Sequence, residues 1–332
     1  MTPFKIAFFD TKRYDKEFFQ AANREYNFEI KYFDSHLTKD TAILAQGFSV
    51  VCVFVNDQID APLIEILHRL GIKLIALRCA GYNNVDLPAA QDKISVVRVP
   101  DYSPYAVAEH AVGMMMTLNR KLHLAYHRTR DNNFSIAGLL GFDMHGKTAG
   151  IIGAGHIGRI VIQILKGLGM RVLSYDIDPA LVKEAGAEYA DLDALFEKSD
   201  IISLHCPLTP QNHHMINNTA LAKMKKGVML INTGRGGLID TSDLLENLKN
   251  QKIGAAGLDV YEEESGYFYE DFSHSFISDD LLARLLTFPN VLVTSHQAFF
   301  TREALQNIAK TTLRSIFDFS QDKPLQNEVK SV

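Results

Sequence analysis

Short apolar runs alternate with amphipathic stretches over the first hundred residues. Runs rich in β-branched and aromatic residues predict strands at residues 4–9, 49–55, 73–78 and 95–99. Between two of them, residues 61–70 carry apolar side chains at helical spacing (Leu63, Ile66, Leu67 and Leu70). Strands that alternate with helices favour a parallel sheet with helices on its faces.

The alternation restarts with greater regularity in the second half of the chain. A long helical stretch over residues 103–130 comes first, and its methionines Met114, Met115 and Met116 are expected in the core. Strands are then predicted at 148–152, 171–176, 200–205, 228–232, 255–259 and 291–294. This half alone could build a six-stranded, doubly wound sheet.

The end of the chain predicts a discontinuous domain. A length of 332 residues suggests about two domains. After the last predicted strand there remains mostly one helix, around residues 302–319, which is too short to form a domain. We therefore expect this helix to cross back to the first sheet.

Composition narrows the class of protein. The chain is 47% hydrophobic, which argues against disorder, and its net charge of −5 gives no footprint for a nucleic acid or an anionic membrane. The three cysteines, Cys52, Cys79 and Cys206, are odd in number and far apart, so a reducing compartment is favoured over a disulfide framework. Without a signal segment or a membrane-length apolar run, we expect a cytoplasmic protein.

Three glycines with dinucleotide-binding spacing follow the strand predicted at 148–152. Gly153 permits the tight turn, Gly155 lets the backbone approach a pyrophosphate, and Gly158 lets the next helix pack closely on the strand. The anionic pyrophosphate would then lie at the helix N-terminus. The alternative is a glycine turn in a strand–helix–strand unit that binds no ligand.

An acidic residue completes this fingerprint. Asp176 ends the next predicted strand, 18 residues after Gly158. A carboxylate there can accept hydrogen bonds from an adenosine ribose and would repel a 2′-phosphate, so it favours NAD over NADP. The alternative interpretation is an ordinary residue at the end of a strand.

Three charged residues follow the later strands. In open α/β sheets ligands bind beyond the carboxyl ends of the strands, and Arg235, Glu264 and His296 stand after the strands at 228–232, 255–259 and 291–294. Hydride transfer between an alcohol carbon and nicotinamide needs a matching proton transfer, for which His296 is suited. Arg235 offers a fixed fork of donors to a carboxylate. Glu264 beside the imidazole would orient it and favour its protonated form.

Each of these residues also has a structural interpretation. A single histidine at a strand end is more often structural than catalytic. Glu264 belongs to the acidic run 262–264, for which an exposed surface is the default. Arg235 is harder to explain in this way, because the glycines beside it bring the backbone close to a ligand.

Several motifs together resemble the D-isomer-specific 2-hydroxyacid dehydrogenases, most closely the bacterial D-lactate dehydrogenases among them. The resemblance covers essentially the whole chain. It rests on residues 78–86 (RCAGYNNVD), 108–113 (AEHAVG), the glycine turn at 153–158, 205–209 (HCPLT), 224–240 with its NTGRGG string, 257–264 and 296–299 (HQAF).

The resemblance implies an α/β fold of two doubly wound parallel-sheet domains, Rossmann-like and flavodoxin-like, with a cleft between them. Residues 1–100 and 300–332 would form a discontinuous catalytic domain, and residues 101–299 the NAD-binding Rossmann domain. Family members of this type are usually homodimers, and a higher homo-oligomer stays open. No nucleic-acid or membrane partner is implied.

The resemblance also implies roles for individual residues. Arg235 would bind the substrate carboxylate and carbonyl, His296 would be the acid/base, and Glu264 its partner. The substrate would also meet the backbone of Ala80 and Gly81 and the side chain of Tyr102. Besides the glycines and Asp176, the residues expected to contact NAD are His156, Ile157, Cys206, Pro207, Asn212, Thr233, Gly234 and Asp259.

No metal site is expected. His123 and His127 are four residues apart on the long predicted helix, but no third ligand is placed with them, which favours a surface or interface helix. His213 and His214 are expected to be a loop pair.

The expected function is NAD-dependent reduction of pyruvate to D-lactate, and the D stereochemistry follows from resemblance alone. A bulkier 2-keto acid remains open as the substrate. So does a different class of function, because some relatives of this fold are NAD-sensing transcriptional corepressors. The complete set of Arg235, Glu264 and His296 favours the enzyme.

Overall fold

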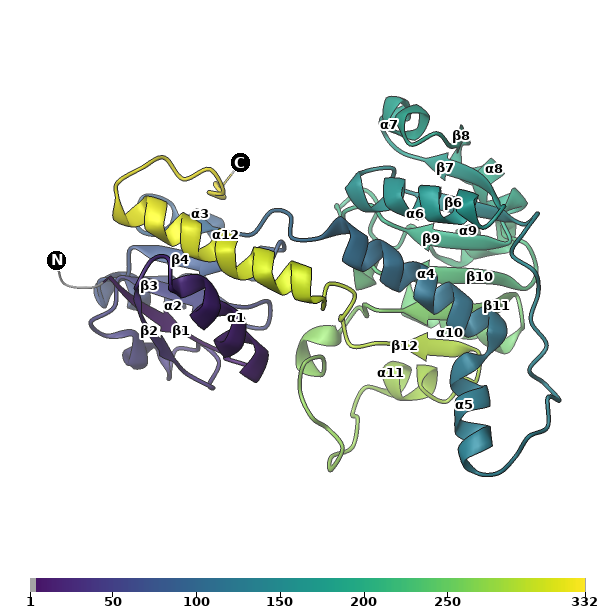
Figure 1. Ribbon diagram of the computed structural model, residues 1–332, viewed down its shortest axis with the longest axis horizontal. Coiled ribbons are helices and arrows are strands. Elements are labelled where there is room, and N and C mark those ends of the chain that lie inside the picture. Colours follow the sequence, from purple (N-terminus) through teal and green to yellow (C-terminus); the bar gives the residue numbers. More distant parts are fainter. Residues whose placement is uncertain (1–3, 332) are drawn as a thin grey trace. The chain divides into compact units, whose positions relative to one another are not determined.

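The computed structural model describes residues 4–331 and divides the chain into two compact units (Figure 1). The terminal unit runs up to Ser103 and resumes at Phe300, and the central unit is Pro104–Phe299. Each unit has its own parallel sheet.

The terminal unit contains a five-stranded sheet of order β2-β1-β3-β4-β5, the flavodoxin-like order. Strands β3 and β4 are buried along their whole length, as expected for the centre of a parallel sheet covered on both faces. The strands are β1 (Lys5–Phe8), β2 (Glu29–Tyr32), β3 (Val50–Val53), β4 (Leu74–Leu77) and β5 (Ser95–Val97). The helices are α1 (Arg13–Asn23), η1 (Ala42–Ala45), α2 (Ala61–Arg69), α3 (Leu87–Ala90) and α12 (Arg302–Ser320).

Helix α12 brings the end of the chain back to the first sheet. It packs alongside α1 and buries Leu305, Ile308 and Ile316 (Figure 1). Beyond it the chain runs along β5, where the N–H of Val329 donates to the carbonyl of Val96 at 2.8 Å. The helix predicted at 302–319 therefore returns as expected.

The central unit contains a seven-stranded parallel sheet of order β12-β11-β10-β9-β6-β7-β8. The strand order reverses between β6 and β9, and such a switch point is where α/β sheets bind ligands. The strands are β6 (Thr148–Ile152), β7 (Arg171–Tyr175), β8 (Glu188–Tyr189), β9 (Ile201–Leu204), β10 (Val228–Asn232), β11 (Ile253–Leu258) and β12 (Val291–Val293).

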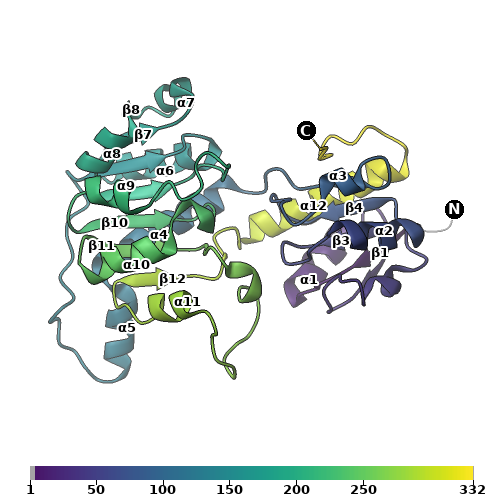
Figure 2. The same cartoon turned by 180° about the vertical axis from the view of Figure 1, so that it is seen from behind.

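Helices cover both faces of this sheet. Figure 1 shows α4 (Pro104–Arg120) and α6 (His156–Gly167) in front of it, and Figure 2 shows the opposite face. The opposite face carries α8 (Leu192–Lys198), α9 (Asn218–Lys223) and α10 (Thr241–Lys249). The remaining helices are α5 (Leu122–Arg130), α7 (Pro179–Glu184), η2 (Gly236–Leu238), η3 (Glu264–Gly266) and α11 (Asp280–Leu285). Between residues 4 and 331, no helix is both long and apolar enough to span a membrane.

The fold class predicted from the sequence is confirmed, with three corrections. The sequence pattern missed β2, an edge strand with no fully buried residue, and β8, a pair of exposed residues. The second sheet therefore has seven strands, although six were predicted. The helix predicted over 103–130 breaks at Lys121, whose φ of +50° lies in the left-handed region and separates α4 from α5.

Candidate active site

The glycine turn after β6 fits a dinucleotide pyrophosphate. Gly153 has a φ of +98°, and a Cβ there would lie 2.7 Å from the backbone of His205 and Cys206. A Cβ on Gly158 would lie 1.8 Å from the carbonyl oxygen of Gly153. Around Gly155, by contrast, a Cβ would meet no atom within 4 Å. The turn is thus closed on its protein side and open at the N-terminus of α6, where an anion is stabilised by unpaired N–H groups.

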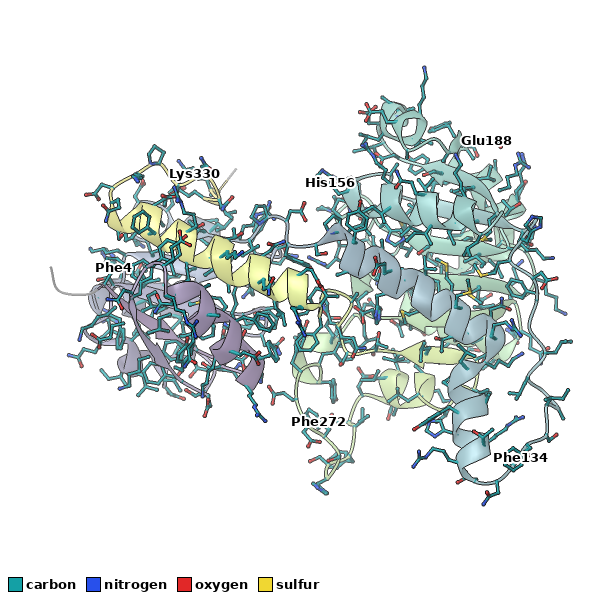
Figure 3. All side chains as sticks on the ribbon, viewed as in Figure 1. Phe4, Phe134, His156, Glu188, Phe272 and Lys330 are labelled. Carbon is teal, nitrogen blue, oxygen red and sulfur yellow. The ribbon has the colours of Figure 1, made fainter. Side chains whose placement is uncertain are left out.

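Asp176 ties the end of β7 to this turn. Its Oδ2 accepts the N–H of Ala154 at 2.7 Å, and its Oδ1 accepts the N–H of Asp178 at 3.0 Å. The carboxylate therefore lies beside the glycine turn, where a ribose is expected. His156 and Ile157 begin α6, and Figure 3 labels His156 there.

The loop after β9 is closed by one side chain. The amide of Asn212 donates to the carbonyl of Pro207 at 2.8 Å and accepts the N–H of Thr209 at 2.7 Å. Burial raises the pKa of the Cys206 thiol to about 11 and lowers the pKa of His205 to about 4. Near neutral pH both side chains are therefore uncharged, which suits the backbone next to a bound anion.

Asn232 shapes the loop after β10. Its Oδ1 accepts the N–H of Gly234 at 3.0 Å, and its Nδ2 donates to the carbonyl of Arg235 at 2.9 Å. A Cβ on Gly236 would lie 2.1 Å from the backbone of Tyr261, so this loop packs against the loop after β11. The Oγ1 of Thr233 is buried and has no hydrogen-bond partner in the described chain, which fits a residue that contacts a ligand.

Glu264 and His296 form an oriented pair. Nδ1 of His296 lies 2.7 Å from Oε1 of Glu264, and the second oxygen of that carboxylate accepts the N–H of Tyr261 at 2.9 Å. The hydroxyl of Tyr269 donates to the carbonyl of His296 at 2.9 Å. The pair leaves Nε2 of the imidazole for a substrate, since the other nitrogen is taken by the carboxylate.

Asp259 holds the loop that carries His296. Its buried carboxylate accepts the N–H groups of Gln297 and Ala298, both at 2.9 Å, and the hydroxyl of Thr294 at 2.5 Å. Burial by itself would raise the pKa of Asp259, but hydrogen bonds from His110, Thr294 and the Ala298 N–H outweigh it and hold the pKa below its usual range. The carboxylate therefore stays ionised as an acceptor for the loop.

The three charged residues share one edge of the sheet. Strands β10, β11 and β12 are parallel neighbours, so Arg235, Glu264 and His296 all follow strand ends on the same side. The structure brings Glu264 and His296 into direct contact. Arg235 instead donates to the carbonyl of Gly234 at 2.7 Å.

Three further residues expected to meet the substrate, Ala80, Gly81 and Tyr102, belong to the terminal unit, although Tyr102 was predicted in the central domain. Ala80 and Gly81 follow β4, and the carbonyl of Ala80 accepts Nη1 of Arg98 at 2.8 Å. The carbonyl of Tyr102 accepts Nδ2 of Asn307, on α12, at 2.7 Å. Both backbone segments are thus anchored within their own unit.

His213 and His214 form more than an ordinary loop pair. Their rings stack with centroids 3.9 Å apart, and Nε2 of His214 pairs with Glu262. The second carboxylate oxygen of Glu262 accepts the hydroxyl of Thr241 at 2.7 Å. His213, His214 and Glu262 each offer one possible ligand atom within 4.8 Å of the others, and in this structure His214 and Glu262 are hydrogen-bonded to each other.

Sequence reasoning missed several residues that build the site. Asn232, Tyr269, Thr294 and His110 are all hydrogen-bonded to the loops that hold Arg235 or His296. His110 and Asn232 carried a signal, because they lie in the AEHAVG motif at 108–113 and in the NTGRGG string. The others are common residue types whose contacts depend on the fold.

Known proteins are similar to this chain in both sequence and structure. Residues 112–298 match the NAD-binding domain of the D-isomer-specific 2-hydroxyacid dehydrogenases. The D-lactate dehydrogenase of Escherichia coli is 54% identical, over 98% of this chain and 99% of its own. The chain belongs to the D-isomer-specific 2-hydroxyacid dehydrogenase family.

Solved structures agree with this assignment. The pyruvate reductase of Chlamydomonas reinhardtii is 46% identical and matches with a TM-score of 0.93, over 98% of each chain. A D-lactate dehydrogenase from Lactobacillus jensenii with NAD⁺ is 33% identical and matches with a TM-score of 0.82, over 98% of this chain and 100% of its own. The family is one of NAD-dependent oxidoreductases, so the predicted cofactor and enzyme class are confirmed.

Proposed function

We propose that this dehydrogenase reduces pyruvate to D-lactate with NADH. The oriented Glu264–His296 pair carries the proposal, because it supplies an acid/base at the strand ends where Arg235 also stands. The 54% identity to the D-lactate dehydrogenase of Escherichia coli supports pyruvate as the keto acid.

The glycine turn and its neighbours would hold the cofactor. Gly153, Gly155 and Gly158 would receive the pyrophosphate at the start of α6, together with His156 and Ile157. The carboxylate of Asp176 would accept the ribose hydroxyls, which supports NAD over NADP. We assign further cofactor contacts to Cys206, Pro207, Asn212, Thr233, Gly234 and Asp259.

The chain's own residues would bind the keto acid and supply its proton. Arg235 would pair its guanidinium with the carboxylate and polarise the carbonyl. Glu264 accepts from Nδ1 of His296 and so orients the ring, whose protonated form would donate its Nε2–H to the carbonyl oxygen. Bound NADH supplies the hydride for the carbonyl carbon. We assign Ala80, Gly81 and Tyr102 to the substrate on the strength of the family resemblance.

A substrate panel tests this function. Oxidation of NADH should be fastest with pyruvate, slower with phenylpyruvate, and chiral analysis should give D-lactate. Faster turnover of phenylpyruvate or a branched keto acid would assign a bulkier substrate. Absence of turnover with every keto acid would favour an NAD-sensing binding protein.

Replacement of the proposed acid tests the mechanism. The His296→Ala variant should lose roughly 10²–10⁴ in kcat, because it lacks the proposed proton donor. Its affinity for NADH, measured by fluorescence titration, should stay close to that of the unmodified enzyme. Full activity in this variant would refute the role of His296.

We also propose a homodimer in the cytoplasm with a role in fermentation. Apolar side chains gather on α5 and on the segment that follows it, and Figure 3 labels Phe134 there. Exposed apolar groups of this kind favour a protein partner, here a second copy of the chain. The buried thiols of Cys52 and Cys79 fit a reducing compartment, and regeneration of NAD⁺ from NADH by pyruvate is a fermentative reaction.

A further inference from the structure

A cluster of three polar side chains connects α4 with the two loops that build the acid/base. Nε2 of His110, on α4, lies 3.2 Å from Oγ1 of Thr294 and 3.4 Å from Oδ1 of Asp259. The Thr294 hydroxyl in turn donates to the same carboxylate oxygen at 2.5 Å. Because that hydroxyl donates its proton to Asp259, its oxygen is left to accept from His110. The hydrogen bonds therefore run from His110 through Thr294 to Asp259.

Asp259 is the centre of this cluster. Its carboxylate is fully buried, and among residues 4–331 His110 is the only side chain able to carry positive charge that pairs with it. A buried carboxylate is costly without donors, and here two backbone N–H groups, the Thr294 hydroxyl and His110 surround it. Loss of any of these donors leaves the buried charge of Asp259 less compensated.

The backbone of His296 depends on that acceptor. Its φ of +52° lies in the left-handed region, which costs free energy for a residue with a Cβ. The conformation is held because the His296 N–H donates to the carbonyls of Asp259 at 2.7 Å and Thr294 at 3.1 Å. The next two N–H groups donate to the Asp259 carboxylate. The direction of the imidazole toward Glu264 therefore depends on the Asp259–Thr294 framework.

We propose that His110 is a positioning residue, which fixes His296 in its orientation toward Glu264 by anchoring Thr294 and Asp259 to helix α4. This inference rests on the proposed function, since it assigns His296 the proton transfer. His110 acts through the loop and contacts neither His296 nor Glu264 in the described structure. Small displacements of a catalytic group lower the rate of chemistry more than they lower binding.

Two substitutions at this position separate a hydrogen-bond role from a packing role. His110→Leu removes the donor, whereas His110→Gln keeps an N–H at a similar distance from the backbone. In His110→Leu, kcat with pyruvate should fall roughly tenfold to a hundredfold, while KM for NADH changes little. His110→Gln should recover much of the loss. The control is His274→Gln, because His274 is exposed on a loop of the same unit and should leave kcat unchanged.

A double-mutant cycle tests whether His110 acts through the Thr294 hydroxyl. Thr294→Val removes the hydroxyl that joins His110 to Asp259. Once that hydroxyl is gone, adding His110→Leu should cost much less in kcat than it does in the unmodified enzyme. Fully additive losses would overturn the proposed connection.

Nuclear magnetic resonance of ¹⁵N-histidine-labelled protein reports directly on the position of the His296 imidazole. The Nδ1 proton that His296 shares with Glu264 should resonate far downfield, and in His110→Leu it should shift or broaden while it stays in place in His110→Gln. An unchanged signal in His110→Leu overturns the inference, whether or not kcat falls. If His110→Leu does not fold, the same comparison between Thr294→Val and Thr294→Ser decides the question.

These measurements distinguish two failures. If the unmodified protein turns over no 2-keto acid, the proposed function is wrong, and the imidazole signal still tests the positioning. If the unmodified protein is active and His110→Leu matches it in kcat and in the signal, only the role of His110 is wrong.

Discussion

The three glycines of the turn after β6 differ in whether the fold leaves room for a side chain. Gly153 has both a positive φ and a backbone neighbour at 2.7 Å, so its conformation and its space each exclude a side chain. Gly158 has ordinary helical geometry and is restricted by the carbonyl of Gly153 alone. A Cβ on Gly155 would meet no atom within 4 Å, and the backbone of Gly155 is extended. Space at Gly155 is therefore not needed by the fold, which supports its assignment to a ligand.

Substitution of these glycines should separate folding from binding. Gly158→Ala should destabilise the protein by at least about 2 kcal/mol, because a Cβ would collide with backbone. Gly155→Val should leave the unfolding temperature unchanged and raise the Kd for NADH roughly tenfold or more. Thermal unfolding and fluorescence titration measure the two effects. An unfolding temperature lowered equally in both variants would contradict the assignment.

The carboxylate of Asp176 should determine the choice of cofactor. Asp176→Asn keeps the shape and one acceptor for the Ala154 N–H but removes the charge that would repel a 2′-phosphate. The ratio of kcat/KM for NADPH to that for NADH should rise about tenfold or more. Asp178→Asn is the matched control, because Asp178 caps α7 and is exposed. An unaltered ratio in Asp176→Asn would show that the charge of Asp176 does not determine the choice of cofactor.

At the scale of elements, the sequence predicted those strands whose buried residues form continuous apolar runs. The buried strands β3, β4, β6 and β10 appear as apolar runs, because both faces of a parallel sheet are covered. Strand β2 alternates exposed and half-buried positions at a sheet edge, and β8 is only two residues long. Neither can produce an apolar run.

The break between α4 and α5 was hidden for a different reason. Lys121 is not a residue that favours the left-handed conformation, so nothing local in the sequence ends the helix. The difference lies in packing, because α4 buries nine residues and α5 buries none.

The residues of the candidate site also divide into those that the sequence could predict and those that it could not. Arg235 and His296 could be predicted because their chemistry is specific and they follow strand ends, as open sheets require. Asn232 lies in the NTGRGG string, but its hydrogen bonds within the turn could not be predicted, and neither could those of Thr294 to residues distant in sequence. Asp259 was expected to contact the cofactor, and its structural role in the His296 loop was not foreseen.

His205, which directly follows strand β9, should make the free energy of unfolding depend on pH. Burial lowers the pKa of His205 from 6.5 to about 4, and Oγ of Ser203 lies 2.8 Å from its Nε2. Below pH 6.5 the unfolded chain takes up a proton that the folded chain does not. The free energy of unfolding should therefore fall between pH 6.5 and pH 4, by up to roughly 2–3 kcal/mol from this residue.

Urea unfolding at pH 7.5, 6 and 5 checks this. His205→Gln should lose less stability than the unmodified protein on acidification, because it cannot take up the proton. The exposed His274→Gln variant should follow the unmodified protein. Parallel curves for His205→Gln and the unmodified protein would show that the imidazole is not kept neutral by burial.

At the scale of the whole molecule, the apolar surface is concentrated on one part of the central unit. Leu122 and Tyr126 of α5 are exposed, and Ile136 and Leu140 on the following segment are 84% and 86% exposed. Helix α5 contributes no buried residue to its own unit. An element that the fold does not use for its own core is best explained by a partner, and the proposed homodimer supplies one.

The dimer proposed for this surface should dissociate when charge is placed on it. In an Ile136→Glu/Leu140→Glu variant, each lost apolar contact removes roughly 1.5–3 kcal/mol, so the association constant should fall by at least about 10². Sedimentation should then show the 37.2 kDa chain in place of a species of twice that mass. Phe276→Glu is the control, because Phe276 is 84% exposed but lies outside this surface. Circular dichroism should be unchanged in both, since none of the three side chains belongs to a core, and unchanged sedimentation of the double variant would assign the interface elsewhere.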